Sequence, residues 1–126
     1  MKYKENYNWE YLTILYERMN KMNVRLEYAS GTLIAKISGE IDHHTTNHLR
    51  EVLDRELIEK SIKNLILDFN EVSFMDSSGI GVIVGRYKKI DALGGKMMII
   101  RTSEQVDKIL ELSGIKKILS CKKEAV

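Results

Sequence analysis

The chain has 126 residues, 44% hydrophobic and 30% charged, and its 20 basic and 18 acidic side chains leave a net charge of +2. These values are typical of one globular domain and give no electrostatic reason to expect a nucleic acid as partner. No apolar run is long enough to cross a bilayer, so no membrane partner is expected either. The single cysteine, Cys121, excludes an internal disulfide and fits a reducing cytoplasm, where we expect the protein to act.

The first 21 residues differ from the rest because they hold most of the aromatic side chains. Apolar residues recur there at spacings of three and four, as on one face of a helix: Trp9, Leu12, Leu15, Tyr16 and Met19. We expect residues 1–21 to be a docked or frayed extension and residues 22–126 to be the domain. A partner-binding or dimerising helix and a natural start at Met22 are the alternatives. The free protein is expected to be a monomer.

The segments at residues 24–28 and 33–37 alternate apolar and polar side chains and therefore predict two strands. The turn signal Ser30-Gly31 between them predicts that the strands form a hairpin. An apolar stripe over residues 49–57 then predicts a helix, with Asp42 or Thr45 as its cap.

The rest of the chain alternates strands with helices. Residues 65–67 and 97–100 are short apolar runs of the kind found in buried strands. A helix is predicted over residues 80–93, stopped by Gly94-Gly95, with its inward stripe at Ile80, Ile83, Val84, Tyr87 and Ile90.

The last predicted elements are a third helix and a short edge strand. A capping box of Thr102 with Gln105 predicts the start of this helix, which ends at Ser113-Gly114. The edge strand is predicted near residues 115–119. Because alternating strands and helices imply parallel crossovers, the predicted fold class is α/β: one domain with a mixed four- to five-stranded sheet and at least three helices.

Enzyme motifs match this sequence poorly. Ser77 has Gly79 two residues later, but Met75 stands where a nucleophile elbow needs its first glycine, and no phosphate-binding loop occurs. His44 and His48 have a spacing that can hold zinc, yet no further ligand is near, so we interpret them as exposed side chains. We therefore predict no catalytic residue, no cofactor and no metal site.

The segment Asp76-Ser77-Ser78-Gly79 is the most informative one, because it joins a predicted strand to a helix at the sheet edge where α/β domains usually place their sites. From spacing alone, a serine there is first of all an N-cap. The same position tolerates a phosphate, since free N–H groups and the positive end of the helix dipole face it. An enzyme, such as a nucleotide-processing one, that uses Ser77 or Ser78 with Asp76 is the alternative, and it needs a base near the serine.

The helix that follows has a predicted exposed side opposite its apolar stripe, at Ser78, Val82, Gly85, Arg86 and Lys89. Gly81 and Gly85 keep the helix surface low, although a mid-helix glycine costs about 1 kcal/mol relative to alanine. Such glycines are tolerable where something approaches closely. The sequence leaves open whether that neighbour is a partner or the protein's own sheet.

The segment from Ser73 to Lys88 closely resembles the anti-sigma-factor antagonists of the STAS domain family, most of all the stage II sporulation antagonists of endospore-forming bacteria. The segment from Gly39 to Thr45 matches the family pattern before the first helix. Gly94-Gly95-Lys96 and Leu112-Ser113-Gly114 match its later turns. The resemblance extends from Met22 to about Leu119.

The resemblance implies that the unphosphorylated protein binds an anti-sigma factor that is also a serine kinase, and so releases the sigma factor of a sporulation pathway. It implies that this kinase phosphorylates the second serine of the motif, Ser78, and that a PP2C-type phosphatase restores the binding form. A general-stress antagonist of a different sigma factor is the alternative within the class. The partner-binding residues expected from the resemblance and the predicted helix face are Asp42, Asp76, Ser77, Ser78, Gly79, Val82, Arg86 and Lys89.

Overall fold

The computed structural model describes residues 8–12 and 22–125. Its centre is a five-stranded sheet in the order β1-β2-β3-β4-β5. Strand β1 is antiparallel to β2, and all later neighbours are parallel, which confirms the mixed sheet predicted from the sequence. The strands are β1 (Met22–Ala29), β2 (Thr32–Ile41), β3 (Asn64–Met75), β4 (Met97–Ile100) and β5 (Ser120–Lys122).

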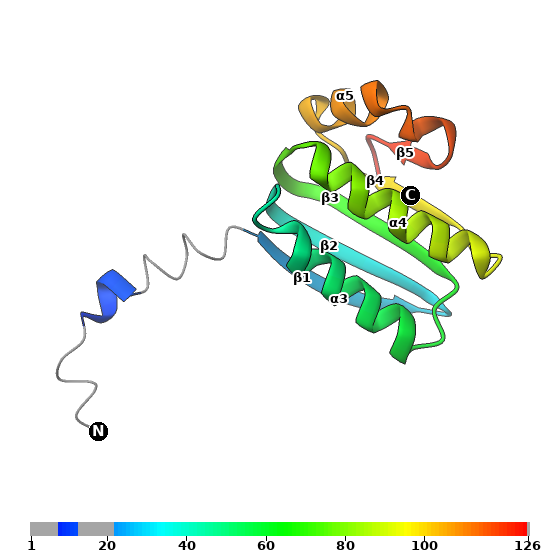
Figure 1. Cartoon of the computed structure of the whole chain (residues 1–126), viewed down its shortest axis with the longest axis horizontal. Coiled ribbons are helices and arrows are strands. Elements are labelled where there is room, and N and C mark those ends of the chain that lie inside the picture. Colours follow the sequence, from blue (N-terminus) through cyan, green and yellow to red (C-terminus); the bar gives the residue numbers. More distant parts are fainter. Residues whose placement is uncertain (1–7, 13–21, 126) are drawn as a thin grey trace.

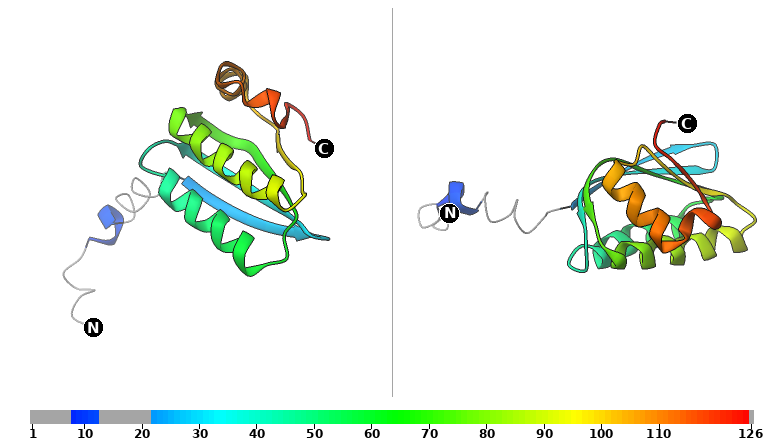
Figure 2. Two further views of the ribbon diagram at one scale, coloured as in Figure 1. Left: turned by 45° about the vertical axis from the view of Figure 1, so that its right-hand side comes forward. Right: turned by 90° about the horizontal axis from the view of Figure 1, so that it is seen from above.

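The helices pack against one face of this sheet and leave the other face uncovered (Figures 1 and 2). They are α3 (Thr46–Glu59), α4 (Ser77–Ala92), α5 (Glu104–Ser113) and the short 3-10 helix η1 (Ile115–Lys117). The core lies between the two layers. Leu33, Leu65 and Met97 are in register across β2, β3 and β4 and are buried. Their successors along each strand, which point to the open face, are only half-buried.

The hairpin of β1 and β2 forms as predicted. Both turn residues have a positive φ, 47° at Ser30 and 79° at Gly31. A two-residue turn of this kind matches the right-handed twist of the strands that it connects.

Two local predictions near the carboxyl end are wrong. The short strand expected over residues 115–119 is instead η1, and β5 follows it. The capping residue of α5 is Ser103, whose Oγ accepts from the Val106 N–H at 3.2 Å. Thr102 is buried and its hydroxyl faces Asp107 at 3.4 Å, so it is not available to cap the helix.

The predicted N-terminal extension lies mostly outside the described residues. Within its described part, residues 9–12 are helical, and Trp9 and Tyr11 are exposed. The predicted apolar face at Leu15, Tyr16 and Met19 lies outside that part.

Candidate functional site

The ends of β2 and β3 bring the two predicted site segments together. Ile41 and Met75 are the last residues of these parallel strands and are paired in register. The Asp76 N–H donates to the Ile41 carbonyl at 3.1 Å. The loop that begins at Asp42 therefore lies beside the start of α4, which is the position of the site in many α/β sheets.

Asp76 is the N-cap of α4, and its carboxylate accepts two hydrogen bonds from Ser78. One oxygen, Oδ1, accepts from the Ser78 backbone N–H at 2.9 Å and also from the Ser78 hydroxyl. The expectation that a serine caps this helix is therefore wrong. An aspartate in extended backbone just before the first turn supplies the acceptor, and the serine is a donor to it. Ser78 is half-buried and Ser77 is exposed.

These contacts favour the charged form of Asp76. The Ser78 hydroxyl is the main reason that the pKa of Asp76 lies below its ordinary value, and the backbone N–H groups of Ser78 and His43 act in the same direction. Partial burial opposes the shift without cancelling it. Near neutral pH the site is therefore a carboxylate that holds a serine hydroxyl.

Asp42 organises the neighbouring loop. Its Oδ1 accepts from the N–H groups of His44 at 2.8 Å and Thr45 at 3.2 Å. Its own N–H donates to the Thr45 hydroxyl oxygen at 2.9 Å. The side chain of Thr45, the N-cap residue of α3, makes no capping hydrogen bond to that helix. Asp42 and Thr45 thus stabilise the loop itself, whereas the sequence predicted that one of them caps α3.

The exposed side predicted for α4 is partly wrong. The residues that this helix buries are Gly79, Val82, Ile83, Arg86 and Ile90. Val82 and Arg86 thus belong to the buried side, because α4 packs against both the sheet and α3 and so buries a wide arc. Sequence reasoning missed Asp54 of α3, whose Oδ1 lies 3.0 Å from Arg86 Nε and 2.9 Å from Lys89 Nζ.

Gly79 is buried at the start of α4. A Cβ at this position would lie 2.6 Å from Met75 Cγ and 3.0 Å from Ile41 Cγ2. The glycine is therefore required so that α4 can start directly against the ends of β2 and β3. Its role in the structure is to position Ser78 rather than to face solvent.

Gly81 and Gly85 differ from Gly79 in this respect. No atom of the described residues lies within 4 Å of a Cβ built at either position, apart from the helix's own nearby backbone. The sequence left open whether the protein's own sheet or a partner approaches these two glycines closely. The structure shows that the sheet does not. Because neither glycine has a side chain, the helix surface is recessed along both positions. This low strip lies on the accessible side of α4, next to the exposed Ser77.

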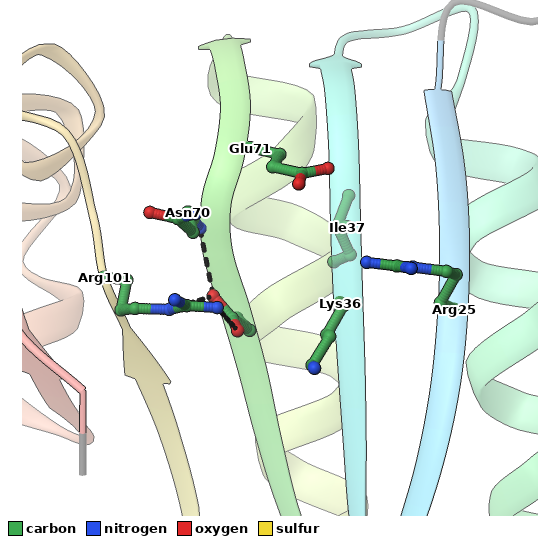
Figure 3. Close-up of a pocket in the computed structure, with 7 residues that line it drawn as sticks. Arg25, Lys36, Ile37, Asn70, Glu71 and Arg101 are labelled. Atoms are coloured by element: carbon green, nitrogen blue, oxygen red, sulfur yellow. Dashed lines mark hydrogen bonds and ion pairs between the residues drawn. The ribbon is translucent and has the colours of Figure 1, made fainter.

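A second polar cluster lies on the open face of the sheet, around a cavity of about 50 Å³ (Figure 3). Asp68 is buried there, and its Oδ1 accepts from Arg101 Nε at 3.0 Å and from the Asn70 N–H at 3.0 Å. Burial alone would raise the pKa of Asp68, but these hydrogen bonds outweigh it and lower the pKa. None of the predicted site residues lines this cavity, so it is separate from the Ser78 site.

The alternative of a serine enzyme gains no support from this geometry. In a nucleophilic triad the serine donates to an imidazole, which a carboxylate orients. Here the Ser78 hydroxyl donates directly to the Asp76 carboxylate.

In the part of the chain that the structure describes, no helix is long and apolar enough to cross a membrane.

The sequence pattern of the STAS domain matches residues 23–125. The chain belongs to the STAS domain family. The anti-sigma F factor antagonist of Paenibacillus polymyxa is 38% identical over 98 residues, which are 78% of this chain and 84% of that protein. The anti-sigma-B factor antagonist of Bacillus subtilis is 33% identical over 98 residues, 78% of this chain and 88% of that protein.

Solved structures of the STAS fold agree with this assignment. The anti-sigma factor antagonist SpoIIAA in its unphosphorylated form superposes with a TM-score of 0.71 at 28% identity, covering 79% of this chain and 87% of that chain. The Bacillus cell fate determinant SpoIIAA in the phosphorylated form gives a TM-score of 0.64 at 27% identity, over 79% of this chain and 90% of that chain. The predicted family and fold class are thereby confirmed.

Proposed function

We propose that this STAS protein is an anti-sigma factor antagonist that phosphorylation of Ser78 switches off. The unphosphorylated form binds an anti-sigma factor with serine kinase activity and releases the sigma factor. The observation that carries this proposal is the position of Ser78, a partly accessible hydroxyl in the first turn of α4 with its backbone N–H held by Asp76. A kinase can reach this hydroxyl, and the cap persists when the hydroxyl is modified.

The physical basis of the proposed switch is charge. A phosphate adds about −1.5 to −2 charges and would stand beside the Asp76 carboxylate in a surface that a partner must dehydrate. Each 1.4 kcal/mol lost is about tenfold in affinity. One phosphate in the contact surface is therefore enough to separate a binding form from a non-binding form without any change of fold.

The docking surface that we propose consists of the accessible residues around this serine. Ser77 and Lys89 are exposed, Asp42 and Asp76 are partly accessible, and the strip at Gly81 and Gly85 lets a partner approach the helix backbone. Gly79, Val82 and Arg86, which were expected in the partner surface, are buried and act instead by holding α4 in place.

The pathway that we propose is sporulation, because a relative at 38% identity is an anti-sigma F factor antagonist. We further propose that a PP2C-type phosphatase reverses the modification, that the free protein is a cytoplasmic monomer, and that it acts as a kinase substrate and not as an enzyme. A general-stress antagonist is the second candidate, since the anti-sigma-B factor antagonist of Bacillus subtilis is 33% identical.

The experiment that tests the proposal is incubation of the purified protein with ATP and each anti-sigma kinase of the same genome, followed by intact-mass measurement and peptide mapping. We expect one phosphate, on Ser78, from one of these kinases, and binding of that kinase only before modification. Ser77→Ala is the matched control and should still be labelled. Labelling that is lost in Ser77→Ala but kept in Ser78→Ala would contradict the assignment.

A further inference from the structure

Arg86 is a buried cation at the contact between α3 and α4, which lie side by side (Figures 1 and 2). Its side chain is only 6% exposed, and its Nε lies 3.0 Å from Oδ1 of Asp54 on α3. Lys89, almost one turn further along α4, places its Nζ 2.9 Å from the same oxygen. One carboxylate oxygen is thus shared by two cations.

The shared carboxylate does not satisfy Arg86 completely. Nε and Nη1 of Arg86 and Oδ1 of Asp54 are buried, and none of these atoms makes a hydrogen bond to a residue that the structure describes. The contact is therefore an attraction of charges without hydrogen-bond geometry, although buried polar groups normally have hydrogen-bond partners. Burial is the main reason that the pKa of Arg86 is lowered, and the charge of Asp54 opposes this shift only in part.

Arg50 adds a third cation on the same side of α3. It precedes Asp54 by four residues, and side chains at this spacing are neighbours on one face of a helix. Arg50 is exposed, its Nη1 donates to Asn47 Oδ1 at 2.8 Å, and it makes no ion pair within the described part of the chain. Glu51, its neighbour in the sequence, is exposed and pairs with none of the three cations in that part. Three cations thus lie around one carboxylate.

This surplus of positive charge lies at one end of the low strip on α4. Gly81, Gly85 and Lys89 follow one another at intervals of four residues and therefore lie along one side of the helix. Lys89 is about 12 Å from Gly81 along the helix axis, at 1.5 Å per residue. Its side chain is 48% exposed, so a partner that lies over the two glycines can reach its Nζ. Arg86 stays covered and contributes only its charge.

We propose that the anti-sigma factor places an acidic side chain on Lys89 and Arg50, at the contact between α3 and α4. The inference rests on the proposed function and adds the chemistry of the partner's contact, a carboxylate. Such a carboxylate would pair with Lys89 in place of Asp54 and leave Asp54 to the buried Arg86. Complementary charges at the edge of a docking surface act mainly on the rate of association and on its dependence on salt.

The test measures the association rate of the full chain with each anti-sigma kinase of the same genome by surface plasmon resonance. Salt at about 50 mM and about 500 mM gives weak and strong screening of the charges. We expect Lys89→Glu and Arg50→Glu each to associate about tenfold more slowly at low salt, with a smaller difference at high salt. Lys108→Glu makes the same change of charge at an exposed position of α5, and this matched control should associate like the parent.

Lys89→Gln removes the charge without adding a second carboxylate beside Asp54, and it should show a smaller loss in the same direction. It keeps the test decisive if amide spectra show that Lys89→Glu disturbs α4. Association of the Lys89 variants at the parent's rate, faster association, or an equal loss in Lys108→Glu would overturn the inference.

The failure of this inference can be told apart from failure of the proposed function. If no anti-sigma kinase binds the unmodified parent, the proposed function fails and this inference fails with it. If one kinase binds the parent and all the charge variants alike, only the acidic contact is overturned.

Discussion

Asp76 accepts two hydrogen bonds from Ser78, one from its backbone N–H at 2.9 Å and one from its hydroxyl. The residue that we propose as the switch is therefore also part of the cap of α4. Modification of the hydroxyl removes one of these bonds and leaves the backbone bond in place. We therefore expect the helix to keep its start in the phosphorylated form, so that the switch acts on the surface and not on the fold.

The first prediction concerns this cap. Asp76→Ala removes both acceptor contacts and should lower the free energy of unfolding by about 1 kcal/mol, the usual value of an N-cap side chain. Asp76→Asn keeps a side-chain acceptor and should lose less. Urea denaturation at neutral pH measures both variants against the parent. Equal stability of Asp76→Ala and the parent would show that the cap contributes nothing.

The same cap predicts a pH dependence. Because the pKa of Asp76 is lowered in the folded protein, chiefly by the Ser78 hydroxyl, its contribution to stability is present above the ordinary pKa of an unfolded aspartate. It is lost as the pH falls through the lower folded value. The difference in unfolding free energy between the parent and Asp76→Asn should therefore shrink from pH 6 toward about pH 2–3. A difference that grows on acidification would reverse the sign of this argument.

The second prediction concerns the charge at position 78. Ser78→Ala should fold and bind the anti-sigma factor but accept no phosphate. Ser78→Asp should bind at least about tenfold more weakly, because even one negative charge opposes Asp76 in a surface that must be dehydrated. Calorimetric titration with the kinase and a non-hydrolysable nucleotide measures both. Unchanged affinity of Ser78→Asp would count against a charge switch.

The third prediction concerns the low strip on α4. Gly81→Ala should raise the free energy of unfolding by about 1 kcal/mol, because alanine is the better helix former and its Cβ meets no other described residue at this position. The same change should weaken partner binding if the partner approaches the helix backbone there. Stability and affinity would then change in opposite directions.

Gly79→Ala is the contrasting variant on the same helix. Its Cβ would lie 2.6 Å from Met75 Cγ, so it should destabilise the fold in spite of the better helix propensity. Denaturation of the two variants side by side separates the effects. A gain in stability from Gly79→Ala would show that the start of α4 is less tightly packed than the structure indicates.

The layer structure could be predicted from the sequence because each of its signals is local. The alternation of apolar and polar side chains at residues 24–28 and 33–37 indicates strands with one covered face. Ser30-Gly31 indicates the turn between these two strands. The Asp76–Ser78 segment could be placed for the same reason, since a strand ends and a helix starts there.

The orientation of α4 could not be predicted from periodicity alone. Arg86 is nearly fully buried because Asp54, 32 residues earlier in the chain, supplies a carboxylate on the facing side of α3. An arginine is normally expected to face solvent, and only a carboxylate supplied by another helix makes burial of Arg86 favourable. The contact between Ile41 and Asp76, which brings the Asp42 loop beside the start of α4, could not be predicted for a similar reason, because it depends on two strand ends that lie far apart in the sequence.

The last prediction concerns Asp68 and Arg101 on the open face of the sheet. Asp68 is 4% exposed and Arg101 adopts a φ of 56°, which is rare for a residue with a side chain. The pair of Asp68 and Arg101 joins β3 to the residue that follows β4. Arg101→Ala leaves a buried carboxylate without its cation and should lower the free energy of unfolding. Urea denaturation at neutral pH measures this.

The sign of its pH dependence follows from the hydrogen bonds. They lower the pKa of Asp68 although burial opposes them, so the pair stabilises the fold above the ordinary aspartate pKa and is lost as the pH falls through the lower folded value. The parent and Arg101→Ala should thus converge in stability toward about pH 2–3. Glu27→Gln, which removes the more exposed pair with Lys36, is the control and should cost less than about 1 kcal/mol at neutral pH. A larger loss from Glu27→Gln than from Arg101→Ala would show that burial of Asp68 does not strengthen its pair.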